Sequence, residues 1–249
     1  MKLASIEKCL SIIDLLSNSP HGLRLSEIGN ALNLPSSSVH HILSTLLPHD
    51  FVNQDPATRK YALGYRFLEM SRRILDHFDI RHLARYDLRQ LQDLCGQTVH
   101  LAVLQHNKVI YIDKVSSSVG LSLATYVGFA TDPHAAAGGK VLLSELPESE
   151  LKRIFPTGRL KQYGKKTITG IPDLLQELGK IRRQGYALDD EEYYEGVRCI
   201  AAPIRAGGKI VAALSITGSI FAMTDERIGG EYKDMVVQTA SNISARLQW

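Results

Sequence analysis

The sequence predicts an α+β protein of two parts, a small helical head with a β-hairpin and a larger domain built on an antiparallel sheet. In residues 1–64, three stretches with apolar residues at helical spacing precede two short strand-like segments. In the last two thirds, pairs of strand-like segments joined by short turns alternate with amphipathic helical stretches. Antiparallel strands flanked by helices define the α+β class.

The head contains three predicted helices. The first covers residues 5–17. We expect Ser26 to cap a second helix over residues 27–32, and Ser36 to cap a third over residues 36–47, because a serine hydroxyl accepts a hydrogen bond from a free amide of the first turn. Two short helices joined by a tight turn, after a longer first helix, form a helix-turn-helix arrangement.

A predicted hairpin of residues 51–54 and 60–63 follows, and its position is that of the wing in a winged helix. In this geometry the outward side chains of the third helix face the major groove of DNA, and Arg59 and Lys60 meet phosphates from the hairpin. The alternative is a polar helix face that is merely solvated. The expected DNA-facing residues of the helix are Ser36, Ser37, Ser38, His40, His41, Ser44 and Thr45.

The charges of the head cancel, because five basic residues are balanced by five acidic ones. Affinity for DNA that arises from counterion release should therefore be small for one head. We expect two or more heads to act together. The ten residues are Lys2, Lys8, Arg24, Arg59 and Lys60 against Glu7, Asp14, Glu27, Asp50 and Asp55.

A basic linker helix is predicted over residues 66–78, and a second helix over residues 80–95. Most arginines of these two helices are expected to be solvated, although Arg66 and Arg72 could lie near the DNA backbone. A long helix that leaves a small domain is also a candidate dimer seam. The expected domains are residues 1–64 for the winged helix-turn-helix, 65–79 for the linker helix and 80–249 for the second domain.

The second domain alternates strands and helices in a pattern typical of an antiparallel sheet of PAS or GAF type. Predicted strands cover residues 98–105, 108–115, 121–126, 197–204 and 209–217. Predicted helices cover residues 135–146, 148–154 and 173–184, with a final helix capped by Thr224 that runs to the C-terminus.

Composition favours a cytoplasmic globular protein. Of 249 residues 44% are hydrophobic and 22% charged, and no apolar run approaches the roughly 20 residues that cross a bilayer. The N-terminus lacks the apolar segment of a signal peptide. Three widely spaced cysteines without metal-ligand spacing indicate reduced thiols, so we expect no cofactor, no metal ion and no membrane partner.

Over essentially its full length the chain resembles the IclR-type bacterial transcriptional regulators. The residues that carry the resemblance are 25–28, 34–40 and 59–64 in the head, and Val127-Gly128, 133–135, Gly139-Lys140, 185–203 and 212–218 in the second domain. The resemblance implies a winged-helix DNA-binding domain and a GAF-like effector-binding domain, in dimers that often pair into tetramers. Two places depart from the family: Ser36 and His41 stand where it often has Lys and Arg, and residues 136–138 replace a Thr/Ser-containing segment.

The resemblance also implies a pocket for small organic acids or aromatic compounds, with walls from Leu121, Leu123, Ala137, Gly138, Asp189, Val197, Cys199, Ser215 and Thr217. The residue pattern agrees, because Ser215 and Thr217 share one strand face, as do Val197 and Cys199. Backbone amides at a helix start would suit a carboxylate.

The acidic run 189–192 is the most unusual local feature, because it leads directly into an apolar strand. We expect Asp189 to face the pocket as a hydrogen-bonding partner. Glu191, Glu192 and Glu195 are expected to face solvent.

The leading hypothesis is a repressor of a nearby catabolic operon, in which a small-molecule effector changes binding to a double-stranded DNA operator. A redox-sensing regulator that uses Cys199 is one alternative, and it would need an exposed thiolate. A small-molecule hydrolase built on Cys199 and His134 is another, but the sequence has no G-x-S-x-G motif, so we expect no enzyme.

Overall fold

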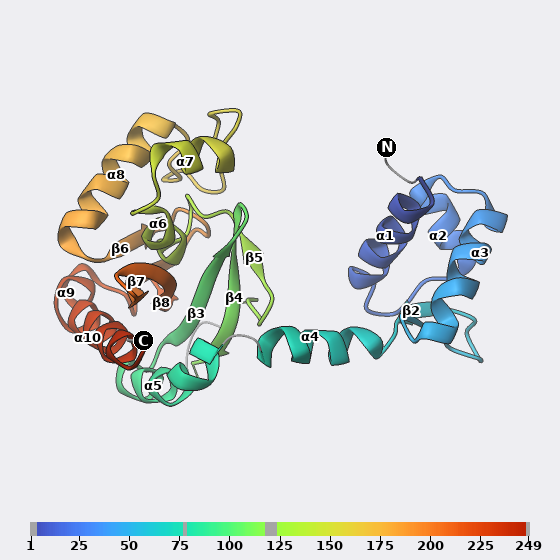
Figure 1. Ribbon diagram of the computed structural model, residues 1–249, viewed down its shortest axis with the longest axis horizontal. Coiled ribbons are helices and arrows are strands. Elements are labelled where there is room, and N and C mark those ends of the chain that lie inside the picture. The colour runs from blue at the N-terminus through green and yellow to red at the C-terminus, as the bar shows by residue number, and fades with distance from the viewer. Residues whose placement is uncertain (1–3, 77–78, 118–123, 248–249) are drawn as a thin grey trace. The chain divides into compact units, whose positions relative to one another are not determined.

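The computed structural model describes residues 4–76, 79–117 and 124–247. The chain divides into two compact units, residues 1–77 and 78–249 (Figure 1). The elements of the first unit are α1 (Ala4–Ser17), α2 (Leu25–Leu32), α3 (Ser36–Leu46), the 3₁₀ turn η1 (Leu47–His49), β1 (Val52–Gln54), β2 (Tyr61–Leu63) and α4 (Arg66–Asp76).

The first unit is a winged helix-turn-helix, as the sequence predicted. The turn between α2 and α3 is tight because Asn33 adopts a left-handed conformation (φ 52°) and ends α2. Strands β1 and β2 pair antiparallel, with Asn53 opposite Ala62, and form the wing. One core joins all three helices to the wing, and its buried side chains are Ile12, Leu16, Ile28, Val39, Leu43, Val52 and Tyr61.

Both predicted serine caps are wrong. Helix α2 begins one residue before Ser26; Arg24 occupies its cap position and donates its backbone amide to the Glu27 carboxylate at 2.6 Å. Helix α3 is preceded by Pro35 at its cap position, and Ser36 is its first helical residue. A proline with extended backbone sets the direction of entry there, so the serine hydroxyl is not needed as a cap.

The second unit contains one six-stranded antiparallel sheet in the order β5-β4-β3-β8-β7-β6. Its strands are β3 (Thr98–Gln105), β4 (Lys108–Val115), β5 (Ala130–Thr131), β6 (Ala187–Asp190), β7 (Val197–Ala206) and β8 (Lys209–Ser219). Its helical elements are α5 (Asp79–Cys95), α6 (Ala137–Leu143), α7 (Glu148–Ile154), α8 (Ile171–Gln184), α9 (Asp225–Arg227), the π-helical turn η2 (Ile228–Tyr232) and α10 (Lys233–Arg246).

The two faces of the sheet differ in chemistry because side chains alternate along each strand. One face is apolar and packs on α5 and α10 (Figure 1); β8 contributes Ala212, Leu214 and Ile216 to it. The opposite face packs on α6, α7 and α8 around buried residues such as Val141 and Leu178. Polar side chains also point to this second face, so part of it is not filled by hydrophobic core.

Several predicted boundaries of the second domain differ from the structure. Residues 124–126 of the expected strand 121–126 are not in a strand, and its first three residues lie outside the described part of the chain. The expected helix 135–146 is limited to α6, and the final helix is interrupted by η2. Strand β6 was not predicted, because its sequence Ala-Leu-Asp-Asp ends in acids, which strands disfavour.

Helix α4 carries three exposed large hydrophobic side chains, Leu68, Met70 and Ile74. No residue of this 11-residue helix is buried, and Leu68 and Ile74 are 67% and 57% exposed.

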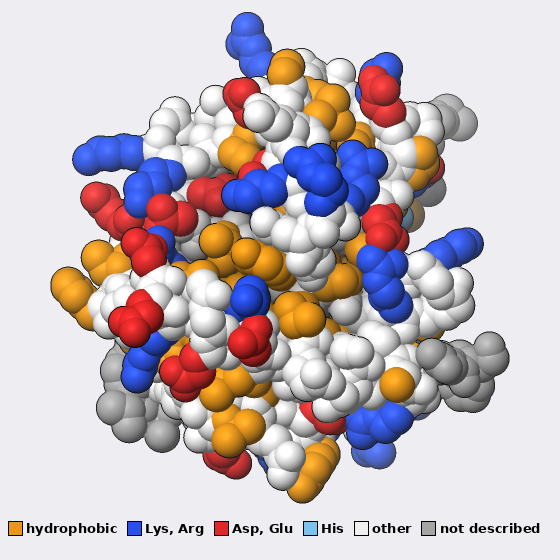
Figure 2. All heavy atoms as spheres, turned by 90° about the vertical axis from the view of Figure 1, so that its left-hand side faces the viewer, with side chains coloured by type: hydrophobic (Ala, Val, Ile, Leu, Met, Phe, Trp, Pro, Cys, Tyr) orange, Lys and Arg blue, Asp and Glu red, His pale blue; other side chains and the backbone are white. Residues whose placement is uncertain are grey.

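The second unit has a mixed surface: on the face in Figure 2, Lys and Arg gather in the upper half, Asp and Glu flank them, and hydrophobic side chains lie between. Within the described residues, no helix is long and apolar enough to cross a bilayer.

The packing of α6 predicts a strong effect of one methyl group. A Cβ added at Gly139 would collide with the backbone of Pro133, whereas a Cβ at Gly229 in η2 would meet nothing within 4 Å. Overpacking against backbone costs about 1–3 kcal/mol or more, so Gly139→Ala should lower the free energy of unfolding by at least that amount. Gly229→Ala should be neutral or slightly stabilising. Urea denaturation followed by circular dichroism measures both, and equal effects would contradict the packing described.

Candidate functional site

A small cavity lies on the polar face of the sheet, under α6 and the turn between β6 and β7. Its volume is about 30 Å³, which is room for one or two water molecules. Its walls come from segments far apart in the sequence. They are His100, Tyr111, Thr125, Phe129, Ala136, Ala137, Gly138, Asp189, Tyr193, Tyr194, Val197, Cys199, Ser215 and Thr217.

The antiparallel register brings the polar side chains of the cavity together. Asp189 of β6 is the partner of Cys199 of β7, and Cys199 is in turn the partner of Thr217 of β8. One row along, Ser215 of β8 is opposite His100 of β3. Because laterally paired residues point to the same face of a sheet, these five side chains form one polar patch.

His100 is a buried, neutral member of this patch. It is 1% exposed, and burial lowers its pKa to about 3, with a further contribution from the Lys114 charge. One ring nitrogen, Nε2, lies 2.8 Å from Thr125 Oγ1, and Nδ1 lies 3.5 Å from Thr217 Oγ1. A neutral imidazole has one donor and one acceptor, so His100 fixes the orientation of hydroxyl groups and carries no charge at neutral pH.

Aromatic rings form the remaining wall. His100 stacks on Tyr111 with ring centroids 4.5 Å apart, and Tyr111 stacks on Phe129 at 5.8 Å. Tyr193 and Tyr194 follow β6 and meet edge to face at 4.6 Å. Burial raises the pKa of Tyr111 far above its ordinary value, so its phenol is neutral. A planar or partly apolar molecule would find flat surfaces here.

Asp189 is the acid of the cavity wall. It is 4% exposed, and burial together with the nearby Glu192 charge raises its pKa to about 7. Its Oδ1 accepts the Glu192 backbone amide at 2.8 Å, which partly offsets this rise. Near neutral pH the Asp189 carboxyl can therefore hold a proton, and it can either donate or accept a hydrogen bond.

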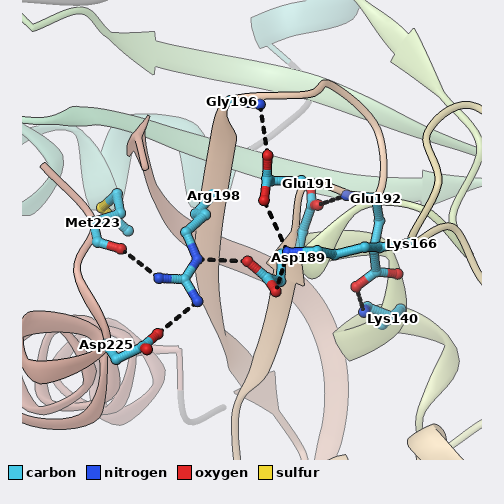
Figure 3. Close-up of polar contacts among 10 residues, drawn as sticks. Lys140, Lys166, Asp189, Glu191, Glu192, Gly196, Arg198, Met223 and Asp225 are labelled. Atoms are coloured by element: carbon cyan, nitrogen blue, oxygen red, sulfur yellow. Dashed lines mark hydrogen bonds and ion pairs between the residues drawn. The ribbon is translucent and has the colours of Figure 1, made fainter. Parts of the chain in front are cut away.

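A buried ion pair supports the cavity from behind. Lys140 of α6 is 1% exposed, and its ammonium donates to Glu192 Oε1 (Figure 3). The expectation that Glu192 faces solvent is wrong, because its side chain is buried in this pair. An unpaired lysine in the interior would be costly, so the pair ties the β6–β7 turn to α6.

A second network fastens the same turn on its outer side (Figure 3). Arg198 Nε donates to Asp190 at 2.6 Å, and another guanidinium nitrogen, Nη2, donates to Asp225 at 2.7 Å. Lys166 binds Asp190 at 2.9 Å and Glu191 at 2.8 Å. Glu191 is thus partly buried and engaged, contrary to expectation, whereas Glu195 is exposed as expected. Asp190 and Glu191 thus share Lys166, whereas Glu192 is paired with Lys140.

The residues of α3 that were expected to face DNA are accessible to a partner. Ser36, Ser37, His40, His41, Ser44 and Thr45 are exposed, and Ser38 is partly exposed. The hydroxyls of Ser44 and Thr45 donate to the His41 carbonyl at 2.8 and 2.9 Å. Because their protons are used within the helix, these two hydroxyls offer acceptors to a partner, whereas phosphates require donors.

The wing turn is built to expose Arg59. Asp55 Oδ1 accepts the amides of Ala57 and Thr58 at 2.8 and 2.9 Å, and Arg59 lies in a left-handed conformation with φ 58°. The side chain of Arg59 is exposed and that of Lys60 is partly exposed. Two cations therefore stand at the end of the hairpin.

The structure brings together seven of the nine residues expected around the pocket. They are Ala137, Gly138, Asp189, Val197, Cys199, Ser215 and Thr217. Leu121 and Leu123 lie outside the described residues. Sequence reasoning missed His100 and the aromatic wall. The aromatic residues come from different segments, and nothing local connected Tyr193 to a cavity.

A DNA-binding winged helix joined to a cavity-bearing antiparallel domain defines a two-domain regulator. The chain matches the IclR helix-turn-helix domain over residues 5–56 and the bacterial transcriptional regulator IclR C-terminal domain over residues 72–245. It is 31% identical to the Escherichia coli regulator XynR over 98% of this chain and 96% of that protein. It is 30% identical to the E. coli repressor AllR over 98% and 90%.

The crystal structure of the Thermotoga maritima IclR superposes with a TM-score of 0.82 at 33% identity, covering 98% of both chains. This protein belongs to the IclR family of bacterial transcriptional regulators. DNA is accordingly its partner through the helix-turn-helix unit.

The buried ion pair yields a stability prediction. Lys140→Ala should lower the free energy of unfolding by about 3–5 kcal/mol, because it leaves the Glu192 carboxylate buried without its cation. Lys152→Ala is the matched control, since the Lys152–Glu148 pair is 3.0 Å long but exposed, and its loss should cost less than about 1 kcal/mol. Urea denaturation monitored by circular dichroism compares them. Similar losses in both variants would show that the Lys140 pair is not held in the interior.

Proposed function

We propose that the protein is a repressor of a nearby catabolic operon and that a small organic acid or related metabolite binds in the cavity and changes operator affinity. The observation that carries this proposal is the cavity itself, in which polar groups and aromatic rings converge from distant segments. The repressor assignment is supported by the name of one relative, AllR. As a DNA-binding regulator without a membrane-spanning helix among its described residues, it would act in the cytoplasm.

Effector binding has to enlarge the cavity, because about 30 Å³ admits water but not an organic acid. The element suited to move is the turn that carries Tyr193 and Tyr194, because its outer fastening is partly solvent-exposed: the Lys166 side chain is 51% exposed. A ligand that binds only the widened pocket shifts the equilibrium between two states of the protein. In this proposal the shift reaches the DNA-binding heads through the assembly of subunits.

We propose a homodimer that can pair into a tetramer; the exposed side chains of α4 and the charge of the head support this proposal. Helix α4 leaves Leu68, Met70 and Ile74 exposed, a surface that a second copy would cover. One head has no net charge, so it gains little from phosphate neutralisation. Two linked heads would bind an operator far more tightly than one.

The alternatives based on Cys199 are disfavoured by its surroundings. Burial, with Asp189 beside it, raises the pKa of the Cys199 thiol well above its ordinary value. A protonated thiol is a poor nucleophile and a poor redox sensor at neutral pH. His134, the base considered for a hydrolase, does not line the cavity wall, and its Nε2 lies 2.8 Å from the Lys161 carbonyl. We therefore infer a role for Cys199 as a pocket wall and no enzymatic activity.

Arg59 should contribute to DNA affinity through phosphate contact. Arg59→Ala should weaken binding about equally for specific and unrelated DNA, and should reduce the salt slope of log K by about 1 for each head. Arg153→Ala is the control, because Arg153 is a 75% exposed arginine of α7 in the second unit. Mobility-shift titrations at several salt concentrations measure both effects. An unchanged slope in Arg59→Ala would remove the wing from the DNA contact.

The proposed function is tested by DNA upstream of the protein's own and neighbouring genes. The wild type should prefer this DNA over unrelated DNA in mobility shifts, and some member of a panel of organic acids, sugar acids and aromatics should raise its Tm and change that affinity. Thr217→Val should lose the response to the compound by at least tenfold in concentration and keep DNA binding, because it removes a cavity hydroxyl. Thr157→Val, at an exposed loop position, should respond like the wild type. No preference for the upstream DNA would refute the proposal.

A further inference from the structure

The described side chains of the cavity wall carry no positive charge that could neutralise an anionic ligand. Among the described wall residues there is one acid, Asp189, and no Lys or Arg. The walls offer His100 in neutral form, the neutral phenol of Tyr111, and hydroxyls such as Thr217. A carboxylate that enters would meet a second carboxyl group and no cationic side chain in contact with it.

The groups packed around Asp189 act on its pKa in both directions: burial and the Glu192 charge raise it, whereas the Glu192 amide, the Lys140 charge and the Cys199 thiol lower it, and the net effect on Asp189 is a rise. Its strand partner on β7 is the Cys199 thiol, and β3 and β4 supply His100 and Tyr111. The turn after β6 supplies Glu192, whose amide binds Asp189 Oδ1, together with the phenols of Tyr193 and Tyr194. Two buried carboxyl groups therefore lie three residues apart.

The available buried cation is already engaged. Lys140 from α6 is paired with Glu192, and Glu192 Oε2 has no hydrogen-bond partner in the described part of the chain. Lys140 is thus shared between two carboxyl groups, one in ion-pair contact and one at longer range. The other nearby cations do not line the cavity. Lys166 and Arg198 are bound to Asp190 on the outer side of the turn, and Lys114 of β4 donates its ammonium to the Thr125 carbonyl at 2.7 Å.

We propose that an effector acid and Asp189 share one proton, so that a small carboxylate binds this pocket together with a proton held at Asp189. This rests on the proposed function, which supplies the acid. In the widened pocket a bound carboxylate still lies against the wall that carries Asp189, away from bulk water, where like charges repel strongly. One proton between the two groups replaces that repulsion by a charge-assisted hydrogen bond.

The sign of the pH dependence follows. Below about pH 7 the free Asp189 carboxyl already carries its proton, and carboxylate affinity is independent of pH. Above that pH the proton has to be taken from solvent, so affinity falls by about tenfold for each pH unit. A neutral analogue such as the corresponding amide needs no proton, and its affinity does not follow this slope.

The first measurement needs no ligand and uses the full chain. Asp189→Asn keeps an acceptor oxygen for the Glu192 amide and removes the titration. Between pH 5 and 7 Asp189 is already ionised in the unfolded wild type but still protonated in the folded protein, so unfolding releases a proton and wild-type stability falls with rising pH relative to the variant. The Tm of Asp189→Asn minus that of the wild type should therefore increase by about 3 °C per pH unit in this window.

Asp190→Asn is the matched control. The pKa of Asp190 is lowered, chiefly by its hydrogen bonds to Lys166 and Arg198 acting against the opposing effect of burial, so it stays ionised throughout the window. Its Tm difference from wild type should be constant from pH 5 to 7. Parallel profiles for wild type and Asp189→Asn would mean that Asp189 is ionised in the folded protein, and the proposal would be overturned.

The second measurement is calorimetric titration of wild type and Asp189→Asn with acetate, glycolate and benzoate and with acetamide, glycolamide and benzamide. Each is run from pH 6 to 8.5 in two buffers of different ionisation enthalpy, which gives the number of protons taken up. A carboxylate that binds the wild type should take up close to one proton at pH 8.5, and none in Asp189→Asn. Binding without proton uptake, or equal uptake in both proteins, would overturn the proposal.

The two measurements separate the possible failures. If none of the six compounds binds, a small acid is rejected as the effector in the proposed function, and the shared proton is rejected as well. The Tm profiles still report whether Asp189 carries a proton. If a carboxylate binds and regulates without a proton, the proposed function stands and the shared proton alone is rejected.

Discussion

The architecture of the second unit depends on one constraint, the antiparallel register of β3, β8, β7 and β6. Strand alternation sends Leu214 and Ile216 to the face under α5 and α10, and sends Ser215 and Thr217 to the other face. The apolar face provides a continuous core. The opposite face can then carry hydroxyls, a thiol and a carboxyl group without interrupting that core, which is how a polar cavity is tolerated in the centre of the domain.

The acidic run 189–192 acquires its meaning from this arrangement. Its four consecutive carboxyl groups go to different environments: Asp189 into the cavity, Glu192 to buried Lys140, and Asp190 and Glu191 to Lys166 and Arg198. Ion pairs on the inner and the outer side therefore hold this turn in place, and the turn carries two tyrosines of the cavity wall. The inner ion pair is dry and the outer one is partly wet, so the outer contacts are those that can exchange with solvent at low cost.

Much of the fold was accessible from local patterns. The bounds of β3 and β4 were predicted residue for residue, because both strands are rich in β-branched residues and are joined by the two-residue turn His106-Asn107. Two of the three predicted caps were wrong, because Arg24 and Pro35 occupy the cap positions of α2 and α3; the Thr224 hydroxyl accepts the Arg227 amide, as predicted. Strand β6 escaped prediction since its side chains are stabilised by partners distant in sequence, which outweigh the low strand preference of aspartate.

For the site, the sequence by itself determined which residues share a strand face: Val197 with Cys199, and Ser215 with Thr217. It also determined membership of the IclR family, through motifs spread over both domains. Only the tertiary structure decided that Glu192 is buried, that His100 and Tyr111 complete the wall, and that Lys140 is the counter-charge. The reason is that burial and pKa depend on groups brought near by folding, such as a lysine 52 residues away, and no local pattern encodes those distances.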